Sequence, residues 1–502
     1  MPDTPMRAAA FVRHDQIPPS PPPASQTGIV KWVRENLFPS IGGTILTLVS
    51  IWMIYTLLVS VLPWTFSGVW STGSLAECRE VLQGRIGACF SVLTERWNQL
   101  LFGFKYPSDL YWRPTLAFVL LLAAAAPVLF FDLPRKLLIF TALYPFIAFY
   151  LIWGGTVWAP ICALLGFAGG YMVYGRLVKD NFAMGLFGGA AMAVMIWLLG
   201  AHLLNHGIAL LFSGPLLFAT GVGVLAVAAL FFRLRRSQSA ASAAIIGGAV
   251  LTGWLAIVAS VLVPVVFGNE IDAGGAQQGG SFALEAVPSR DMGGFMLNML
   301  LGVVCVSLSL PLGILLALGR QSNMPIIKWI CIMFIEFIRG VPLITLLFVA
   351  NVVLAYFLPP GTNFDLILRV IIMITMFASA YIAEVIRGGL AALPRGQYEA
   401  ADSLGLDYAQ SMRLIILPQA LKISIPGIVN VAVGLFKDTT LVSVISMFDL
   451  VGMIRGPILA STAWNGVYWE LYGFAALLFF IVCYGISQYS QWLERRLATD
   501  HR

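Results

Sequence analysis

The sequence predicts an all-α polytopic membrane protein with about 12 transmembrane helices. Of its 502 residues, 59% are hydrophobic and only 11% are charged, and the mean hydropathy is +0.86. A soluble domain carries roughly 25% charged residues, so most of this chain must face lipid or its own interior. The apolar runs are continuous rather than alternating, which favours helices of about 20 residues over a β-barrel.

Twelve apolar runs are long enough to be membrane spans. We expect them near residues 40–63, 114–131, 137–153, 157–174, 184–204, 207–232, 241–267, 293–318, 326–357, 365–386, 424–447 and 469–492. The residues before the first run are polar and include a proline-rich stretch at 18–25. This pattern predicts a disordered tail and an uncleaved first span rather than a signal peptide.

Basic residues predict the orientation, because cytoplasmic loops carry an excess of Lys and Arg. With the N-terminus inside, the cytoplasmic connections hold Arg135, Lys136, Arg176, Lys179, Arg233, Arg235, Arg236, Arg320, Lys328, Arg387, Arg395, Arg413, Lys422, Arg495 and Arg496. The expected outside loop 268–290 has three acidic residues and one arginine, whereas loop 64–113 is mixed. We therefore expect both termini in the cytoplasm, and the net charge of +6 reflects this sorting rather than a nucleic-acid partner.

The composition divides the chain into five segments. A disordered cytoplasmic tail (1–38) precedes an N-terminal transmembrane bundle (39–267) that contains the outside loop 64–113. A glycine-rich outside linker (268–289) leads to a compact five-span unit (290–495), and a short cytoplasmic tail (496–502) follows. No internal repeat stands out, which argues against a transporter built from paired inverted halves.

Two cysteines and two histidines need separate interpretations. Cys78 and Cys89 share the loop 64–113, where they form a disulfide if the loop is periplasmic or remain two free thiols. His202 and His206 have the i, i+4 spacing of metal ligands, but no cysteine or carboxylate lies near them in the sequence. We expect a structural role for both histidines, and no metal site.

The segment 396–418 is polar although it lies between two apolar runs. Gln397 to Leu404 is expected to form a short helix that ends at Gly405. Asp407 can cap a second short helix, with Gln410 as the returning partner, and Pro418 is expected to end that helix. Such a segment is either a solvated amphipathic loop or a docking surface. In a docking surface, the small residues Ala400, Ala401 and Gly405 would let the backbone of another protein come close.

Opposite charges recur in pairs within the five-span unit. Glu336 and Arg339, and Glu384 and Arg387, have i, i+3 spacing, while Lys437 and Asp438 are adjacent and precede Thr439. Charges at membrane depth are costly and usually pair or line a path. They can be structural ion pairs or a path for a zwitterionic solute; Ser379 and Tyr381 join the candidates for their depth and polarity.

The polar segment carries a family resemblance. Glu399-Ala400-Ala401, three residues, Gly405, nine residues, Ile415, one residue and Leu417-Pro418 resembles the EAA signature of ABC importer permeases. The flanking stretches 337–348, 380–390, 417–430 and 436–445 resemble the polar amino-acid branch of these permeases. The long N-terminal bundle is similar to that of the larger permease subunit of bacterial general L-amino-acid importers.

The resemblance implies a C-terminal five-helix ABC importer permease core whose segment 396–418 is a cytoplasmic coupling helix. Its partners would be an ABC ATPase dimer, a homologous second permease and a periplasmic amino-acid-binding protein, in a bacterial inner membrane. The coupling residues would be Glu399, Ala400, Ala401, Gly405, Asp407, Ile415, Leu417 and Pro418. The chain has no Gly-Lys-Ser/Thr phosphate loop, so ATP and magnesium would bind the partner ATPase. The substrate would be an L-amino acid.

Two other classes of protein remain open from the residues alone. An ion-coupled secondary transporter of small zwitterions would need neither ATP nor partners. A membrane scaffold or channel module would have no transport cycle. An enzyme is disfavoured because no nucleophile–base set or metal cluster stands out in the sequence.

Overall fold

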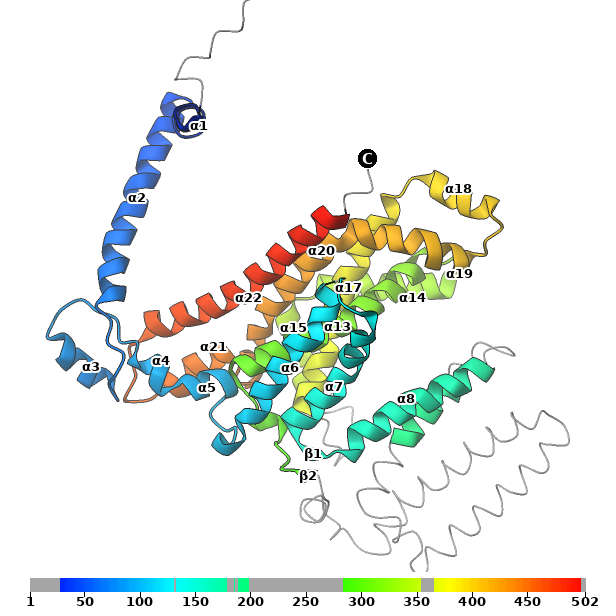
Figure 1. Ribbon diagram of the computed structural model, residues 1–502, viewed down its shortest axis with the longest axis horizontal. Helices are drawn as coiled ribbons and strands as arrows, with labels where there is room; N and C mark the ends of the chain where they lie inside the picture. Colours follow the sequence, from blue (N-terminus) through cyan, green and yellow to red (C-terminus); the bar gives the residue numbers. More distant parts are fainter. Residues whose placement is uncertain are drawn as a thin grey trace, which may run out of the picture. The chain divides into compact units, whose positions relative to one another are not determined.

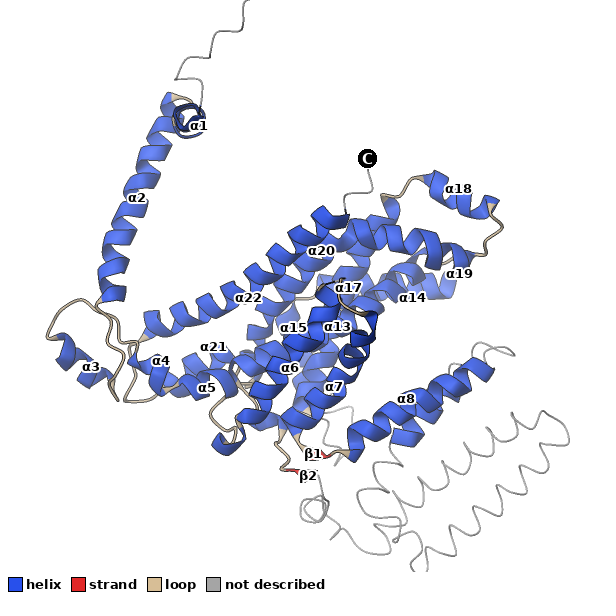
Figure 2. Ribbon diagram, in the orientation of Figure 1, coloured by secondary structure: helices blue, strands red, loops and turns tan. Residues whose placement is uncertain are grey.

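The computed structural model describes residues 28–130, 132–177, 185, 188–197, 283–353 and 365–497. Helices dominate this part of the chain (Figure 2). Its only strands, β1 (Gly155–Thr156) and β2 (Ala283–Leu284), pair antiparallel with Gly155 opposite Leu284. The predicted all-α membrane class is therefore confirmed.

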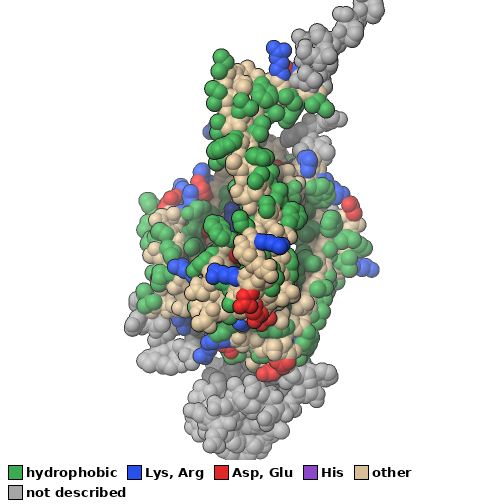
Figure 3. Space-filling model, turned by 90° about the vertical axis from the view of Figure 1, so that its left-hand side faces the viewer, with side chains coloured by type: hydrophobic (Ala, Val, Ile, Leu, Met, Phe, Trp, Pro, Cys, Tyr) green, Lys and Arg blue, Asp and Glu red, His purple; other side chains and the backbone are tan. Residues whose placement is uncertain are grey.

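The chain separates into two compact units, Met1–Thr94 and Glu95–Arg502. The first contains α1 (Gly28–Leu37), α2 (Ile41–Phe66), α3 (Leu75–Leu82) and the start of α4 (Ser91–Glu95). Helix α2 buries none of its residues, and hydrophobic side chains cover it along its length (Figure 3). An apolar helix of this length with no protein around it is suited to a lipid environment.

The second unit begins with α5 (Trp97–Phe102), α6 (Trp112–Leu129), α7 (Leu138–Trp153) and α8 (Trp158–Leu177) (Figure 1). It continues with α13 (Gly294–Gln321), α14 (Pro325–Gly340), α15 (Leu343–Phe348) and α17 (Leu366–Ala391). The last elements are α18 (Arg395–Ser403), α19 (Tyr408–Ser411), α20 (Leu417–Asp438), α21 (Leu450–Met453) and α22 (Tyr468–Leu497). Short 3-10 helices lie at Ser108–Leu110, Arg135–Leu137, Ser289–Asp291 and Thr439–Ile445, and π-helical turns at Val349–Val353, Met412–Ile416 and Ile454–Ile458.

Seven helices among the described residues are long and apolar enough to cross a membrane, or eight if one bent pair is a span. They are Ile41–Phe66, Ser108–Leu129, Arg135–Trp153, Gly294–Gln321, Leu366–Ala391, Met412–Ile445 and Tyr468–Leu497. The predicted spans 207–232 and 241–267, and residues 184, 186, 187 and 198–204 of the predicted span 184–204, lie outside the described residues, as do His202 and His206. Helix α8 matches the predicted span 157–174 in position without meeting this test.

The predicted span 326–357 is built from two helices rather than one straight helix. Helices α14 and α15 meet at an angle of 104° across Val341 and Pro342. Pro342 cannot donate a backbone hydrogen bond, so the helix ends before it and a new one starts after it.

The core of the second unit is packed around α13 and α17. Leu297, Leu301 and Cys305 of α13 are fully buried beside Val370 and Ile374 of α17. Close approach of the two helices depends on Gly313, where an added Cβ would lie 2.6 Å from a methyl of Ile382. A small residue at such a crossing lets two membrane helices pack tightly.

The hairpin α6–α7 belongs to this core, although the sequence placed it in a separate bundle ending at residue 267. Ala117 of α6 and Leu151 of α7 join the same buried cluster as α13 and α17. The guanidinium of Arg113 donates to the carbonyl of Glu285 at 2.6 Å. At the other end of the hairpin, Tyr489 of α22 donates to the carbonyl of Leu129.

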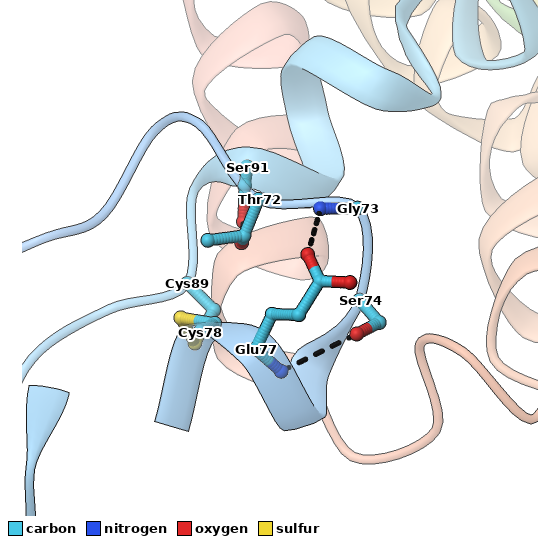
Figure 4. Close-up of a disulfide and its surroundings, with 7 residues drawn as sticks. All are labelled: Thr72, Gly73, Ser74, Glu77, Cys78, Cys89 and Ser91. Atoms are coloured by element: carbon cyan, nitrogen blue, oxygen red, sulfur yellow. Dashed lines mark hydrogen bonds between the residues drawn. A yellow bond between two sulfur atoms is a disulfide. The ribbon is translucent and has the colours of Figure 1, made fainter. Parts of the chain in front are cut away.

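The loop after α2 is a small disulfide-bonded fold (Figure 4). The structure joins Cys78 and Cys89, one of the two alternatives that the sequence left open. Ser74 caps α3 by accepting from the backbone N–H of Glu77 at 3.3 Å, and the Glu77 carboxylate accepts from the N–H of Gly73 at 2.8 Å (Figure 4). These bonds satisfy backbone donors at the start of α3.

Candidate functional site

The polar segment 396–418 folds as two short helices joined by a glycine turn. Helix α18 ends in a Schellman motif, in which Gly405 adopts the left-handed conformation with φ +69°. The N–H of Leu406 donates to the carbonyl of Ala401, and that of Gly405 to Asp402. The break predicted at Gly405 is confirmed.

Helix α19 starts with the reciprocal cap that the spacing predicts. The Asp407 carboxylate accepts from the N–H of Gln410 at 2.7 Å, and the Gln410 side chain accepts from the N–H of Asp407 at 3.3 Å. This capping box satisfies two backbone donors with short, local side chains. The shape of the segment is therefore set largely within Gly405 to Gln410.

Pro418 does not end the second helix as the sequence predicted. It lies in the first turn of α20, and the helical path runs on from Met412 to Ile445. Proline has no N–H and its ring crowds the preceding turn. The turn before it widens to a π-helix at Met412–Ile416, in which the N–H of Leu417 donates to the carbonyl of Met412.

The exposed side of this segment combines acidic and apolar groups. Glu399, Ala400, Gly405 and Asp407 are exposed, and 72% of the Leu404 surface is accessible. Tyr408 and Leu414 are also exposed apolar side chains. Ala401 was expected on the docking surface, but it is fully buried and packs inward.

The inner side of the segment is fixed to the transmembrane helices. Tyr398 and Ile415 pack against a buried cluster that includes Ile335 of α14 and Ile382 and Ile386 of α17. The side-chain amide of Gln419 donates to Gln397 at 2.9 Å, which joins the start of α20 to α18. Figure 1 shows α18 and α19 at the same end of this unit as the C-terminal end of α22. A force on α18 can therefore be passed to α14, α17 and α20 through these contacts.

Five charged side chains form one network beside that cluster. Glu384 of α17 lies 2.5 Å from Arg387, 3.2 Å from Arg320 and 3.5 Å from Arg339. Arg320, from the last turn of α13, also contacts Glu336 at 2.8 Å. The pairing of Glu384 with Arg387 is confirmed, whereas Arg339 pairs with Glu384 of another helix rather than with Glu336 as the i, i+3 spacing suggested.

Arg339 is the least satisfied member of this network. Its guanidinium carbon lies 5.5 Å from the centre of the Tyr381 ring, within cation–π range. Its Nε is buried and has no hydrogen-bond partner among the described residues. The side chain as a whole is 32% exposed, so a small anion can reach the guanidinium.

The network lies near one end of the core, not at mid-membrane as the sequence suggested for Glu336 and Arg339. Arg320 is the penultimate residue of α13, and Glu384 lies in the last two turns of α17, just before α18. Ser379 is fully buried, and its hydroxyl donates to the carbonyl of Met376 in its own helix. A fully buried side chain does not line an accessible path in this conformation.

Lys437, Asp438 and Thr439 lie at the opposite end of the core. Helix α20 starts beside α18 and ends at Asp438, about 30 Å further along its axis. The sequence placed these residues halfway along the span 424–447, whereas α20 begins at Leu417 and ends at Asp438, where a 3-10 helix follows. The three predicted charge pairs therefore do not form one group.

The structure reveals a buried polar cluster around Asn298 and Asp449, two residues that the sequence did not single out. The Asn298 amide donates to Thr439 at 2.9 Å and to Asp449 at 3.2 Å, and it accepts from the N–H of Leu450. Asp449 caps α21 and has no exposed surface. Burial raises its pKa to about 6, although hydrogen bonds from Gly452, Asn298 and Val451 oppose the shift.

Comparisons with known proteins agree with this architecture. Residues 309–499 match the family described as "Binding-protein-dependent transport system inner membrane component". The "Glutamate/glutamine/aspartate/asparagine transport system permease protein BztC" of Rhodobacter capsulatus is 47% identical over 99% of this chain and 100% of its own length. The "Inner membrane amino-acid ABC transporter permease protein YhdY" of Escherichia coli is 33% identical over 96% of each chain.

One solved structure, titled "Crystal structure of an amino acid ABC transporter with histidines", is 32% identical. It covers 40% of this chain and 91% of its own, with a TM-score of 0.36. The full-length relatives decide the family. The chain belongs to the amino-acid ABC transporter permeases: it is a multi-pass inner-membrane permease of a binding-protein-dependent importer, not itself an enzyme, and a partner ATPase handles ATP.

Proposed function

We propose that this permease carries acidic amino acids and their amides into the cytoplasm, together with a homologous second permease that completes the pore. A periplasmic binding protein delivers the amino acid, and an ATPase dimer drives the cycle. Residues 290–495 are the permease domain, preceded by the N-terminal bundle 39–267 and the linker 268–289, within a chain of about 12 spans. The substrate class is supported by the name of the relative that is 47% identical over its full length.

The observation that carries the proposal is the shape of segment 396–418. Glu399, Ala400, Gly405 and Asp407 face outward, while Tyr398 and Ile415 pack into the core cluster. A surface of this kind can seat in a cleft of another protein and move the helices behind it. We assign ATPase coupling to Glu399, Ala400, Ala401, Gly405, Asp407, Ile415, Leu417 and Pro418, with Ala401 supporting the surface from within.

The disulfide supports an orientation with the N-terminus in the cytoplasm. Disulfides persist in oxidising compartments such as the periplasm, and Cys78–Cys89 follows α2 directly. If that loop is outside, residues before α2 are inside. The basic residues of the connecting loops support the same orientation.

We propose that the substrate carboxylate meets Arg339 on its way to the cytoplasm. The charged network holds three arginines against two glutamates, which gives it a formal charge of +1. The partnerless Nε of Arg339 and the nearby Tyr381 ring leave one guanidinium edge for a ligand. Glu336 and Glu384 would line this end of the path and Lys437 and Asp438 the other, while the fully buried Ser379 and Thr439 would support them from within the core.

Uptake by the complete importer in proteoliposomes tests the proposal. We expect ATP-dependent uptake of labelled glutamate, glutamine, aspartate and asparagine, with little uptake of leucine. Glu399→Lys should abolish uptake and ATPase binding while the chain still inserts, and Glu80→Lys makes the same charge change at an exposed position of α3 as the control. Normal uptake by the Glu399→Lys importer would overturn the coupling assignment.

The substrate path has its own test. Arg339→Ala should lower uptake far more than it lowers assembly with the ATPase, because the guanidinium would contact the substrate. Arg455→Ala removes an exposed arginine outside the network as the control. Unchanged uptake by Arg339→Ala would leave this residue with a purely structural role.

A further inference from the structure

We infer that helix α1 is an in-plane membrane anchor, seated on the lipid bilayer beside the start of α2. Helix α1 is amphipathic. Ile29, Trp32 and Val33 recur at i, i+3 and i+4, which places them on one side of the helix. Lys31 and Glu35 lie on the other side, where their charges are 3.9 Å apart.

None of the described residues of its own unit, 28–94, covers the apolar side of α1. Ile29 is 81% exposed and Trp32 is 59% exposed. Large apolar side chains exposed together on a short helix mark a surface that another phase or molecule covers. A helix with an apolar side and a charged side is the form that lies along a membrane surface.

An ordered elbow fixes how α1 meets α2. Ser40 caps α2 by accepting from the N–H of Gly43 at 3.1 Å. A Cβ at Gly43 would lie 3.0 Å from the ring of Pro39, so a glycine here lets that ring pack closely. The Thr47 hydroxyl donates to the carbonyl of Leu37 at 2.5 Å, which satisfies an acceptor at the end of α1.

This elbow turns α1 steeply away from the axis of α2. Figure 1 shows α2 along its length, whereas α1 is seen nearly end-on beside its first turn. Because Thr47 lies in the second turn of α2, its bond to Leu37 keeps the end of α1 level with the first turns of the spanning helix. Helix α1 therefore runs across the end of α2 rather than extending it.

The length of α2 places its first turns, and α1 beside them, at the membrane surface. Its 26 residues span about 39 Å, whereas the hydrocarbon core is about 30 Å thick. Shared between the two ends, the excess of about 9 Å leaves roughly one turn beyond the hydrocarbon at each face. The start of α2 and the adjoining α1 then lie at the boundary between headgroups and acyl chains, the depth at which amphipathic helices bind.

The charges of α1 also suit a lipid surface. Lys31 and Arg34 carry two positive charges against the single negative charge of Glu35. Basic side chains beside a membrane are attracted to anionic lipid headgroups. The occupant of the apolar side is therefore the bilayer itself, with the basic side chains at headgroup level.

Spin labelling of the full-length chain in lipid nanodiscs tests this assignment. The four free cysteines Cys162, Cys305, Cys331 and Cys483 are replaced by alanine, and the disulfide is kept. A label is then attached in turn at Ile29→Cys, Val33→Cys, Lys31→Cys and Glu35→Cys. Collision rates are measured with oxygen, which concentrates in lipid, and with a water-soluble nickel chelate.

We expect the oxygen-to-nickel ratio to be several-fold higher at positions 29 and 33 than at 31 and 35. Equal ratios at all four positions would mean that α1 lies in water, and would overturn the assignment. Exclusion of both reagents at 29 and 33 would mean that protein covers the apolar side, and would overturn it equally. Since all four positions are on a surface helix, the labels leave the permease core intact.

Discussion

Replacing Gly405 by alanine tests whether the shape of the coupling segment matters for ATPase binding. Gly405 has φ +69°, a conformation in which a residue with a Cβ costs about 1–2 kcal/mol. A Cβ at this position would meet no heavy atom within 4 Å. The cost is therefore conformational alone, without a clash.

The expected magnitude follows from that cost. A change of 1–2 kcal/mol alters a population about 5–30-fold. If the ATPase binds only the form of segment 396–418 that has the Gly405 turn, its apparent affinity is proportional to the population of that form. Gly405→Ala should thus weaken ATPase binding by up to about 30-fold, and ATP-driven uptake should fall with it.

Titration of the ATPase onto the permease in nanodiscs measures this affinity. Asparagine tolerates the left-handed conformation better than alanine, so Gly405→Asn should weaken binding less. Gly396→Ala is the matched control, because Gly396 lies in helix α18 with open space around it. Equal affinities for Gly405→Ala and Gly396→Ala would refute the role assigned to the glycine turn.

Three further predictions concern the core, the buried acid and the disulfide. Gly389→Ala should destabilise the protein by about 1–3 kcal/mol, because the new Cβ would lie 2.6 Å from the Ala420 carbonyl oxygen. The control Gly388→Ala places its Cβ in open space and should leave the midpoint of thermal unfolding unchanged. Asp449 has a pKa raised from 3.8 to about 6, so its contribution to the free energy of unfolding is present below pH 3.8, and about 3 kcal/mol is lost as the pH rises through 6. Asp449→Asn should remove this pH dependence from thermal unfolding measured between pH 4 and 7. An unchanged pH dependence would contradict the burial argument. Cys78→Ser should make the loop between α2 and α4 cleavable by trypsin from the outside of intact spheroplasts, while Cys483→Ser, which removes a cysteine outside the disulfide, should not.

Local sequence rules predicted the turn and the second helix start of segment 396–418. The Gly405 turn and the Asp407–Gln410 capping box depend on neighbours within a few residues, so their geometry could be predicted from spacing alone. The bounds of α7 likewise agree with the apolar run at 137–153. Pro418 was misinterpreted because a helix that widens to a π-turn can pass a proline that would otherwise end it.

Tertiary partners could not be predicted in the same way. Arg320 was counted only as a basic loop residue, although it contacts Glu336 and Glu384, which lie 16 and 64 residues further along. Asn298 and Asp449, 151 residues apart, were not singled out at all. A buried asparagine in an apolar run was the available signal, since a polar side chain in a membrane helix needs a partner.

The surroundings of Glu384 argue against a role for this carboxylate in ion-coupled transport, the alternative that the sequence left open. An ion-coupled carrier needs a carboxylate that can exchange a proton or a metal cation during the cycle. The oxygens of Glu384 face guanidinium groups of Arg320, Arg339 and Arg387 within 3.5 Å, and such neighbours repel a cation. A substrate carboxylate, by contrast, can compete with Glu384 for Arg339. Because Glu384 lies in the last turns of α17, just before α18, the proposed movement of α18 can change which carboxylate Arg339 holds.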